Sequence, residues 1–203
     1  AITSATYDSL NRVTKITDPL GFFTLLSYDK NDNVVSVTDR NGIIINYTYD
    51  SLNRVKTFTD KNGFVTTVGY DAEGNVIQAK DPNNNITLYT YDSLNRLKTG
   101  AYPDGSFTQY GYDKKSNIIS KRLTDGTIIN FQYDSLNRII SKTLPGGTVY
   151  SYGYDAIGRI ISATNNNGTV TITYDALKRI ASETFDGRTT RYNYNVAGRT
   201  QTT

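Results

Sequence analysis

The residues of this chain that could carry chemistry are its carboxylates, because the 203-residue sequence contains neither His nor Cys. The usual general base near neutral pH and the usual thiol nucleophile are therefore missing. Two carboxylates can act as an acid and base pair, but only where different surroundings separate their pKa values. Most Asp residues here recur with closely similar neighbours, which indicates a structural use. We expect no catalytic residue and no enzymatic activity.

Neighbouring Asp and Asn side chains could also hold Ca²⁺, which prefers oxygen ligands. The sequence lacks the nonapeptide spacing of calcium-binding β-roll repeats, and its acids are kept apart by a longer period. We therefore expect no metal site, no cofactor-binding residue and no cofactor. Without Cys there is no disulfide, but this leaves the cellular compartment undecided.

Composition narrows the range of partners. The 22 basic and 19 acidic residues are spread along the chain and form no basic stripe, so we expect no nucleic acid partner. No apolar run approaches the roughly 18 residues of a membrane span. The hydrophobic fraction of 37% suits a thin or elongated structure. Since the sequence contains no Met, we expect a fragment of a longer protein.

The elements that position the Asp residues form a tandem repeat. Tyr-Asp pairs return at seven steps of 21 residues and then two of 20, the last being Tyr-Asn. The hexapeptide YDSLNR occurs unchanged four times. The pairs begin at Tyr7, Tyr28, Tyr49, Tyr70, Tyr91, Tyr112, Tyr133, Tyr154, Tyr174 and Tyr194. The period predicts one repeat array over residues 1–203, with about nine repeats and a partial one.

Each repeat contains two turn signals. Asp8–Asn11 and Asp18–Gly21 both fit a type I turn that starts at Asp and ends at a residue tolerant of positive φ. Some later copies of the second turn are predicted to shorten, with the acid moved next to Gly. These copies are Asp104-Gly105, Asp125-Gly126 and Asp186-Gly187.

The segments between the turns have the length of strands. In the first repeat they are Arg12–Thr17 and Phe22–Tyr28. Because the turns are too short for a crossover, each repeat should be a β-hairpin and its strands antiparallel neighbours. The predicted fold is all-β, a curled antiparallel meander of about eighteen strands.

Columns of similar residues predict what the strands bury. Val13 and its equivalents are aliphatic in every repeat, so we expect them to be core positions. The Tyr of each Tyr-Asp pair shares a strand face with the residue two before it, which is aromatic or aliphatic, and this forms an aromatic ladder. The opposite face also carries apolar residues. Such a sheet should curl or lie against more of its own kind.

A longer period of 42 residues lies over the repeat. Arg12, Arg54 and Arg96 alternate with Asn33 and Asn75 at the equivalent position. One interpretation is recent duplication of a two-repeat block. The other is that alternate hairpins have different surroundings, with Arg stacked on Tyr or paired with the Asp of its own turn.

The pattern YDxxGR, an aliphatic residue and a second DxxG turn resembles the YD, or Rhs, repeat over essentially the whole chain. In Rhs polymorphic toxins, insecticidal Tc toxin complexes and teneurins, that repeat winds into a large hollow shell. In the bacterial toxins the shell encloses a C-terminal effector. The resemblance implies a structural wall segment of a protein that is secreted or displayed on a bacterial surface. Its implied partners are the rest of its own shell, or identical copies through sheet edges, and an enclosed effector.

The chain departs from the family pattern. Gly before the strand is replaced by Asn in YDSLNR and occurs only at Gly74, Gly158 and Gly198. About ten repeats are also too few to close a shell. The stretch Asp18-Pro19-Leu20-Gly21 looks like the family's self-cleavage signature, but its register favours an ordinary second turn.

One alternative function belongs to the binding class. An exposed Tyr ladder could recognise a glycan or another protein, and an array would make weak sites multivalent. The competing interpretation is that the Tyr rings pack between strands as cross-strand pairs.

Overall fold

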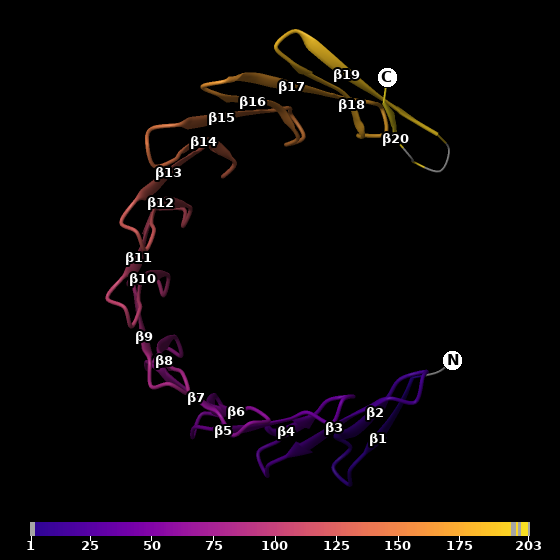
Figure 1. Cartoon of the computed structure of the whole chain (residues 1–203), viewed down its shortest axis with the longest axis vertical. Coiled ribbons are helices and arrows are strands. Elements are labelled where there is room, and N and C mark those ends of the chain that lie inside the picture. Colours follow the sequence, from indigo (N-terminus) through magenta and orange to yellow (C-terminus); the bar gives the residue numbers. More distant parts are fainter. Residues whose placement is uncertain (1–2, 196–197, 199, 203) are drawn as a thin grey trace. The chain divides into compact units, whose positions relative to one another are not determined.

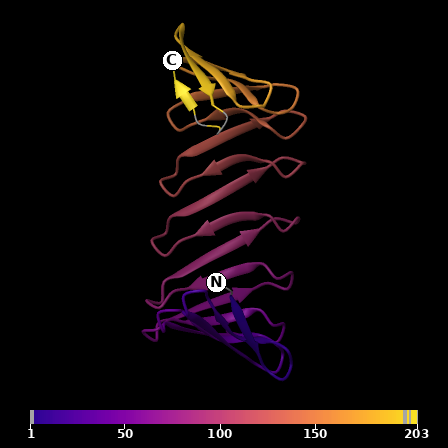
Figure 2. The ribbon, with the colours of Figure 1, turned by 90° about the vertical axis from the view of Figure 1, so that its right-hand side faces the viewer.

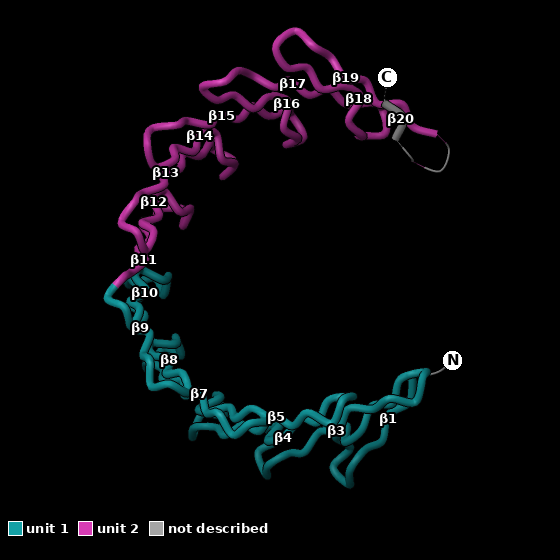
Figure 3. Tube along the Cα trace, viewed as in Figure 1, with its two compact units in different colours: residues 1–105 teal, residues 106–203 magenta. Residues whose placement is uncertain are grey.

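The computed structural model describes residues 3–195, 198 and 200–202, and within them it contains twenty strands and no helix. The chain divides into two compact units, residues 1–105 and 106–203, shown in Figure 3. The prediction of an all-β array of antiparallel hairpins is confirmed. The strands number two more than expected because a strand precedes the first Tyr-Asp turn and another follows the last.

Unit 1 is a meander in which each strand pairs with the next along the chain (Figure 1). Its strands are β1 (Ser4–Tyr7), β2 (Val13–Thr17), β3 (Phe23–Tyr28), β4 (Val34–Thr38), β5 (Ile44–Tyr49), β6 (Val55–Thr59), β7 (Val65–Tyr70), β8 (Val76–Lys80), β9 (Ile86–Tyr91) and β10 (Leu97–Ala101).

Unit 2 is built in the same way. Its strands are β11 (Phe107–Tyr112), β12 (Ile118–Arg122), β13 (Ile128–Tyr133), β14 (Ile139–Thr143), β15 (Val149–Tyr154), β16 (Ile160–Asn165), β17 (Gly168–Tyr174), β18 (Ile180–Phe185), β19 (Arg188–Tyr194) and β20 (Thr200–Thr202).

The Tyr-Asp turns have the predicted geometry. The Asp8 amide donates to the Arg12 carbonyl at 2.9 Å, and the Asn11 amide donates to the Asp8 carbonyl at 3.0 Å. Asn11 has a φ of 62°. This is a three-residue hairpin loop, a type I turn followed by a left-handed residue. The strand after it begins at Val13, one residue later than expected, because Arg12 pairs with Asp8 to close the loop.

Two of the second turns that were predicted to shorten keep their full length, so that prediction is wrong for them. The amides of Gly105 and Gly126 donate to the carbonyls of Tyr102 and Leu123 at 3.0 Å. A backbone carbonyl closes this turn, so its first residue need not be Asp. Asp186-Gly187 alone of the three is a shortened turn.

Shortened turns explain why the last two steps contain 20 residues. Asn165 pairs with Gly168, and Phe185 pairs with Arg188, so only two residues connect each pair. Asp186 and Gly187 both have positive φ, as a two-residue hairpin loop requires. Each of these hairpins therefore loses one residue without losing a strand.

A β-bulge follows each described Tyr-Asp turn. Tyr28 pairs with Val34, whereas Ser27 pairs with Ser36, so Val34 and Val35 together lie opposite Tyr28. The bulge places the aliphatic column and the Tyr on one face of the sheet. We call this the Tyr face. The opposite face, which carries Ser27 and Thr48, is called the Thr face.

The expected core positions are only half-buried, so the prediction of a buried core is wrong. No hydrophobic side chain of the described residues is fully buried. Val13 and its equivalents are partly covered, and Ile160 is 38% exposed. The reason is that the strands of each unit form one layer, visible in Figure 2, with no second layer packed against it. An apolar column therefore gains cover only from its neighbours along the sheet.

Candidate functional site

The carboxylate of each Tyr-Asp turn is used by its own loop. Asp8 Oδ1 accepts hydrogen bonds from the amides of Leu10 at 2.9 Å and Arg12 at 3.0 Å, and Oδ2 accepts from Arg12 Nε at 2.8 Å. The hydrogen bond from the Arg amide, helped by the guanidinium, lowers the pKa of Asp8, and the same contacts lower those of Asp50 and Asp134. These acids are held ionised as structural groups.

The Arg of the turn reaches the next repeat. The Arg12 guanidinium lies 4.7 Å from the centroid of the Tyr28 ring, and its Nη1 donates to the Asp29 carbonyl at 2.9 Å. The Tyr28 hydroxyl in turn donates to the Val13 carbonyl at 2.8 Å. We call the set Asp8, Arg12, Tyr28 and the Val13 carbonyl a repeat clasp. Stacked pairs recur at Arg54–Tyr70, Arg138–Tyr154, Arg159–Tyr174 and Arg179–Tyr194.

Asn replaces Arg in the alternate turns and makes a different connection. Asn33 Nδ2 donates to Asp29 Oδ2 at 3.0 Å and to Asn53 Oδ1 at 2.9 Å. The acceptor belongs to the YDSLNR hexapeptide of the following turn. The same link joins Asn75 to Asn95 at 3.2 Å and Asn117 to Asn137 at 3.0 Å. These contacts support the interpretation that alternate hairpins have different surroundings.

The Tyr residues of the Tyr-Asp pairs are engaged within the sheet. Whether the preceding turn carries Arg or Asn, their hydroxyls donate to the backbone one repeat earlier at 2.7–2.9 Å. The donors are Tyr28, Tyr49, Tyr70, Tyr91, Tyr133, Tyr154, Tyr174 and Tyr194. Burial raises the pKa of Tyr49, Tyr91 and Tyr133. This part of the aromatic ladder is used for packing.

The described residues contain no group of three or more acidic side chains placed to hold a metal ion. Asp18–Gly21 forms a second turn like the others, with the Gly21 amide donating to the Asp18 carbonyl at 3.0 Å. The part of the chain that the structure describes also provides no helix able to cross a membrane. The absence of catalytic, cofactor-binding and metal-binding residues stays a prediction.

Two classes of contact were not predicted from the sequence. The hydrogen bond from Tyr28 to the Val13 carbonyl depends on strand register, which residue types do not reveal. The link from Asn33 to Asn53 had a signal, since Asn recurs at this 20-residue spacing. The predicted alternatives for Arg, stacking and pairing, both occur at Arg12.

Comparison with known proteins agrees with this geometry. The family model described as Teneurin YD-shell matches residues 17–203. No curated protein sequence is similar enough to count as a relative.

Solved structures share the fold. The crystal structure of TcdB2-TccC3-Cdc42 has a TM-score of 0.71 at 17% identity, over 98% of this chain and 14% of that chain. TcdB2-TccC3 without its hypervariable C-terminal region has a TM-score of 0.68 at 14% identity, over 98% and 15%. The Photorhabdus luminescens Tc holotoxin pore, with a mutation in TccC3, has a TM-score of 0.56 at 13% identity, over 98% and 15%. The chain thus spans about a seventh of each of these chains.

Proposed function

Because this chain belongs to the Teneurin YD-shell family, we propose that it is a non-catalytic wall segment of a shell that encloses a toxin effector. One observation carries the proposal. Arg clasps and Asn links each connect a turn to the following repeat, so neighbouring hairpins are joined along the edge where the Tyr-Asp turns lie. A wall built in this way keeps its continuity without a buried core.

The proposed cargo is a polypeptide effector, and the proposed setting is a secreted or surface-delivered bacterial toxin. The similarity in fold to Tc toxin components, one of them in a holotoxin pore, supports both proposals. Because the chain spans only about a seventh of those chains, the remaining wall would come from further repeats of a longer protein or from identical copies joined at strand edges.

We also propose that residues 1–203 act as a single repeat array. The same turn, bulge and clasp recur in both compact units. Two units with a shared repeat geometry are compatible with one continuous wall.

Electron microscopy of the full-length parent protein tests this function. We expect a hollow particle with residues 1–203 in its wall and with the effector resistant to added protease until the shell is opened. An extended, solid or helical particle, or an effector digested as fast as the free domain, would contradict the proposal.

A further inference from the structure

The regular repeat is interrupted on the Tyr face of unit 2, between β15 and β18. The shortened turn joins Asn165 to Gly168, and Gly168 has a φ of 140°. A Cβ added to Gly168 would lie 2.8 Å from Cε2 of the Phe185 ring. The ring therefore lies against bare backbone, a position that only glycine allows at this φ.

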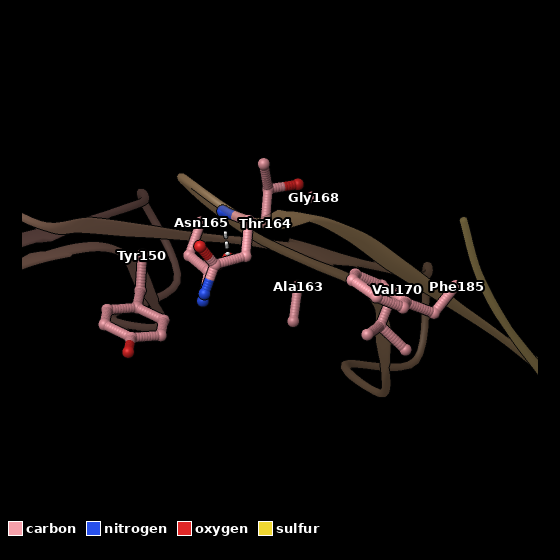
Figure 4. A pocket seen from close by; sticks show the side chains of 8 residues that line it. Tyr150, Ala163, Thr164, Asn165, Gly168, Val170 and Phe185 are labelled. Carbon is pink, nitrogen blue, oxygen red and sulfur yellow. Dashed lines mark hydrogen bonds between the residues drawn. The ribbon is translucent and has the colours of Figure 1, made fainter.

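Beside the shortened turn lies a hollow of about 320 Å³, at the lower end of the range for small-molecule sites. Tyr150 and Phe185 lie on opposite sides of the hollow, as Figure 4 shows, with Ala163 as the floor between them and Val170 beside the Phe185 ring. Asn165 and Asn167 also line the hollow.

Small residues keep this hollow open. Ala163 occupies the sheet position that Phe58 fills in β6 of unit 1, since each pairs with the residue two before a Tyr-Asp pair. A large ring is therefore compatible with the hairpin at this register. In β16 this position holds Ala163, whose side chain is a single methyl group, so the space that a ring would occupy stays unfilled.

The lining determines the class of ligand. Aromatic faces attract the positively polarised edges of C–H groups, and the amides supply both donors and acceptors. Asn165 Oδ1 accepts a hydrogen bond from the backbone amide of Asn167 at 2.8 Å, which orients the Asn165 side chain. No charged residue lines the hollow, whereas the neighbouring hollow at Phe131 and Tyr152 contains Lys142.

We propose that this hollow binds a neutral saccharide. Tyr150 and Phe185 would stack on the sugar ring, and the side chains of Asn165 and Asn167 would form hydrogen bonds with its hydroxyl groups. A saccharide matches this lining because it presents apolar C–H faces to the aromatic rings and hydroxyl groups to the amides. An anionic ligand would find no compensating charge among the lining residues. The site is independent of whether the wall encloses an effector.

The test begins with the intact chain on an array of neutral and acidic glycans, followed by titration calorimetry with the strongest neutral ligand. Tyr150→Ala removes one platform and should weaken binding about tenfold. Ala163→Phe should abolish binding by filling the floor, while its unfolding midpoint stays close to that of the parent chain. Tyr110→Ala, on the same face outside the hollow, is the matched control and should bind normally.

Binding lost in Tyr150→Ala and Ala163→Phe but retained in Tyr110→Ala would support the site. Several outcomes would overturn it: no glycan bound, acidic glycans alone bound, equal loss in all three variants, or a hollow that accepts only peptides. A ¹H–¹⁵N correlation spectrum separates a folding defect from a binding defect, because Ala163→Phe should keep the dispersed amide signals of the parent chain while it loses binding.

Discussion

Individual hydroxyl and carboxylate groups hold neighbouring repeats together in this protein. The Tyr133 hydroxyl donates to the Ile118 carbonyl at 2.9 Å. Tyr152 lies on the same face, and its hydroxyl has no hydrogen bond among the described residues. The two tyrosines share a face of the sheet but differ in whether the hydroxyl donates a hydrogen bond, so they can be compared by the same substitution.

Tyr133→Phe should lower the free energy of unfolding by about 1 kcal/mol, because the half-buried carbonyl of Ile118 loses its side-chain donor. Tyr152→Phe should change it by much less. Urea unfolding followed by circular dichroism measures both. Equal effects of the two changes would mean that the hydroxyl contact contributes nothing.

Acid should destabilise the fold. The pKa values of Asp8, Asp50 and Asp134 are lowered in the folded chain, first by the hydrogen bond from the Arg amide. Their contribution is therefore present above the unfolded value of about 3.9 and is lost as pH falls through the lower folded values. The thermal midpoint should be constant near neutral pH and fall below about pH 3.9. A midpoint that stays level or rises on acidification would contradict this.

Residue types predicted the Asp role and both Arg contacts, because each is local to one turn or to the next. They did not predict the acceptor of the Tyr28 hydroxyl, since that carbonyl is brought near by the pairing of strands. The hollow at Ala163 was also missed. A small residue in one column looks like ordinary variation until the turn beside it is known to be shorter.

At the scale of the elements, the left-handed residue of each turn sets the hairpin. Asn137 has a φ of 62° and also accepts a hydrogen bond from Asn117. Asn137→Gly and Asn137→Ala both remove that acceptor. The difference between them therefore isolates the backbone conformation.

Asn137→Ala should be less stable than Asn137→Gly by about 1 kcal/mol, because a Cβ disfavours positive φ and glycine does not. Leu136→Ala, in the same exposed loop, serves as a control and should be nearly neutral. Chemical unfolding of the three variants gives the values. Equal stability of the Gly and Ala variants would show that the turn can be rebuilt with negative φ.

Strand positions and turns were predictable because both signals recur in every repeat. The prediction of a buried core failed for a physical reason. An apolar column indicates which face is less exposed, but it does not say whether a second layer covers that face. Val13 and its equivalents look alike in either case.

At the scale of the whole molecule, stability should be the sum of neighbour contacts, as in other repeat proteins. Asp134→Asn weakens the clasp between Asp134, Arg138 and Tyr154. Its effect should stay close to that clasp, because the residues that the structure describes form no buried core to transmit it.

Hydrogen exchange tests this locality. The variant should exchange faster in β13 to β16, whereas β2 to β5 should keep the rates of the parent chain. Arg138→Lys, which keeps the charge but loses the planar donor, should have a smaller effect in the same strands. A uniform acceleration along the chain would instead indicate one cooperative unit.

The alternation of Arg and Asn turns, linked by hydrogen bonds between Asn side chains, restricts how such chains can change length. In the alternate turns the Asn side chain donates to the Asn of the YDSLNR hexapeptide in the following turn, as Asn33 donates to Asn53. Unequal crossing-over that adds or removes both turns together preserves every such match, whereas a single-hairpin exchange can leave a donor facing a residue that does not accept. Genes for these walls should therefore grow and shrink by even numbers of hairpins wherever the alternation is kept.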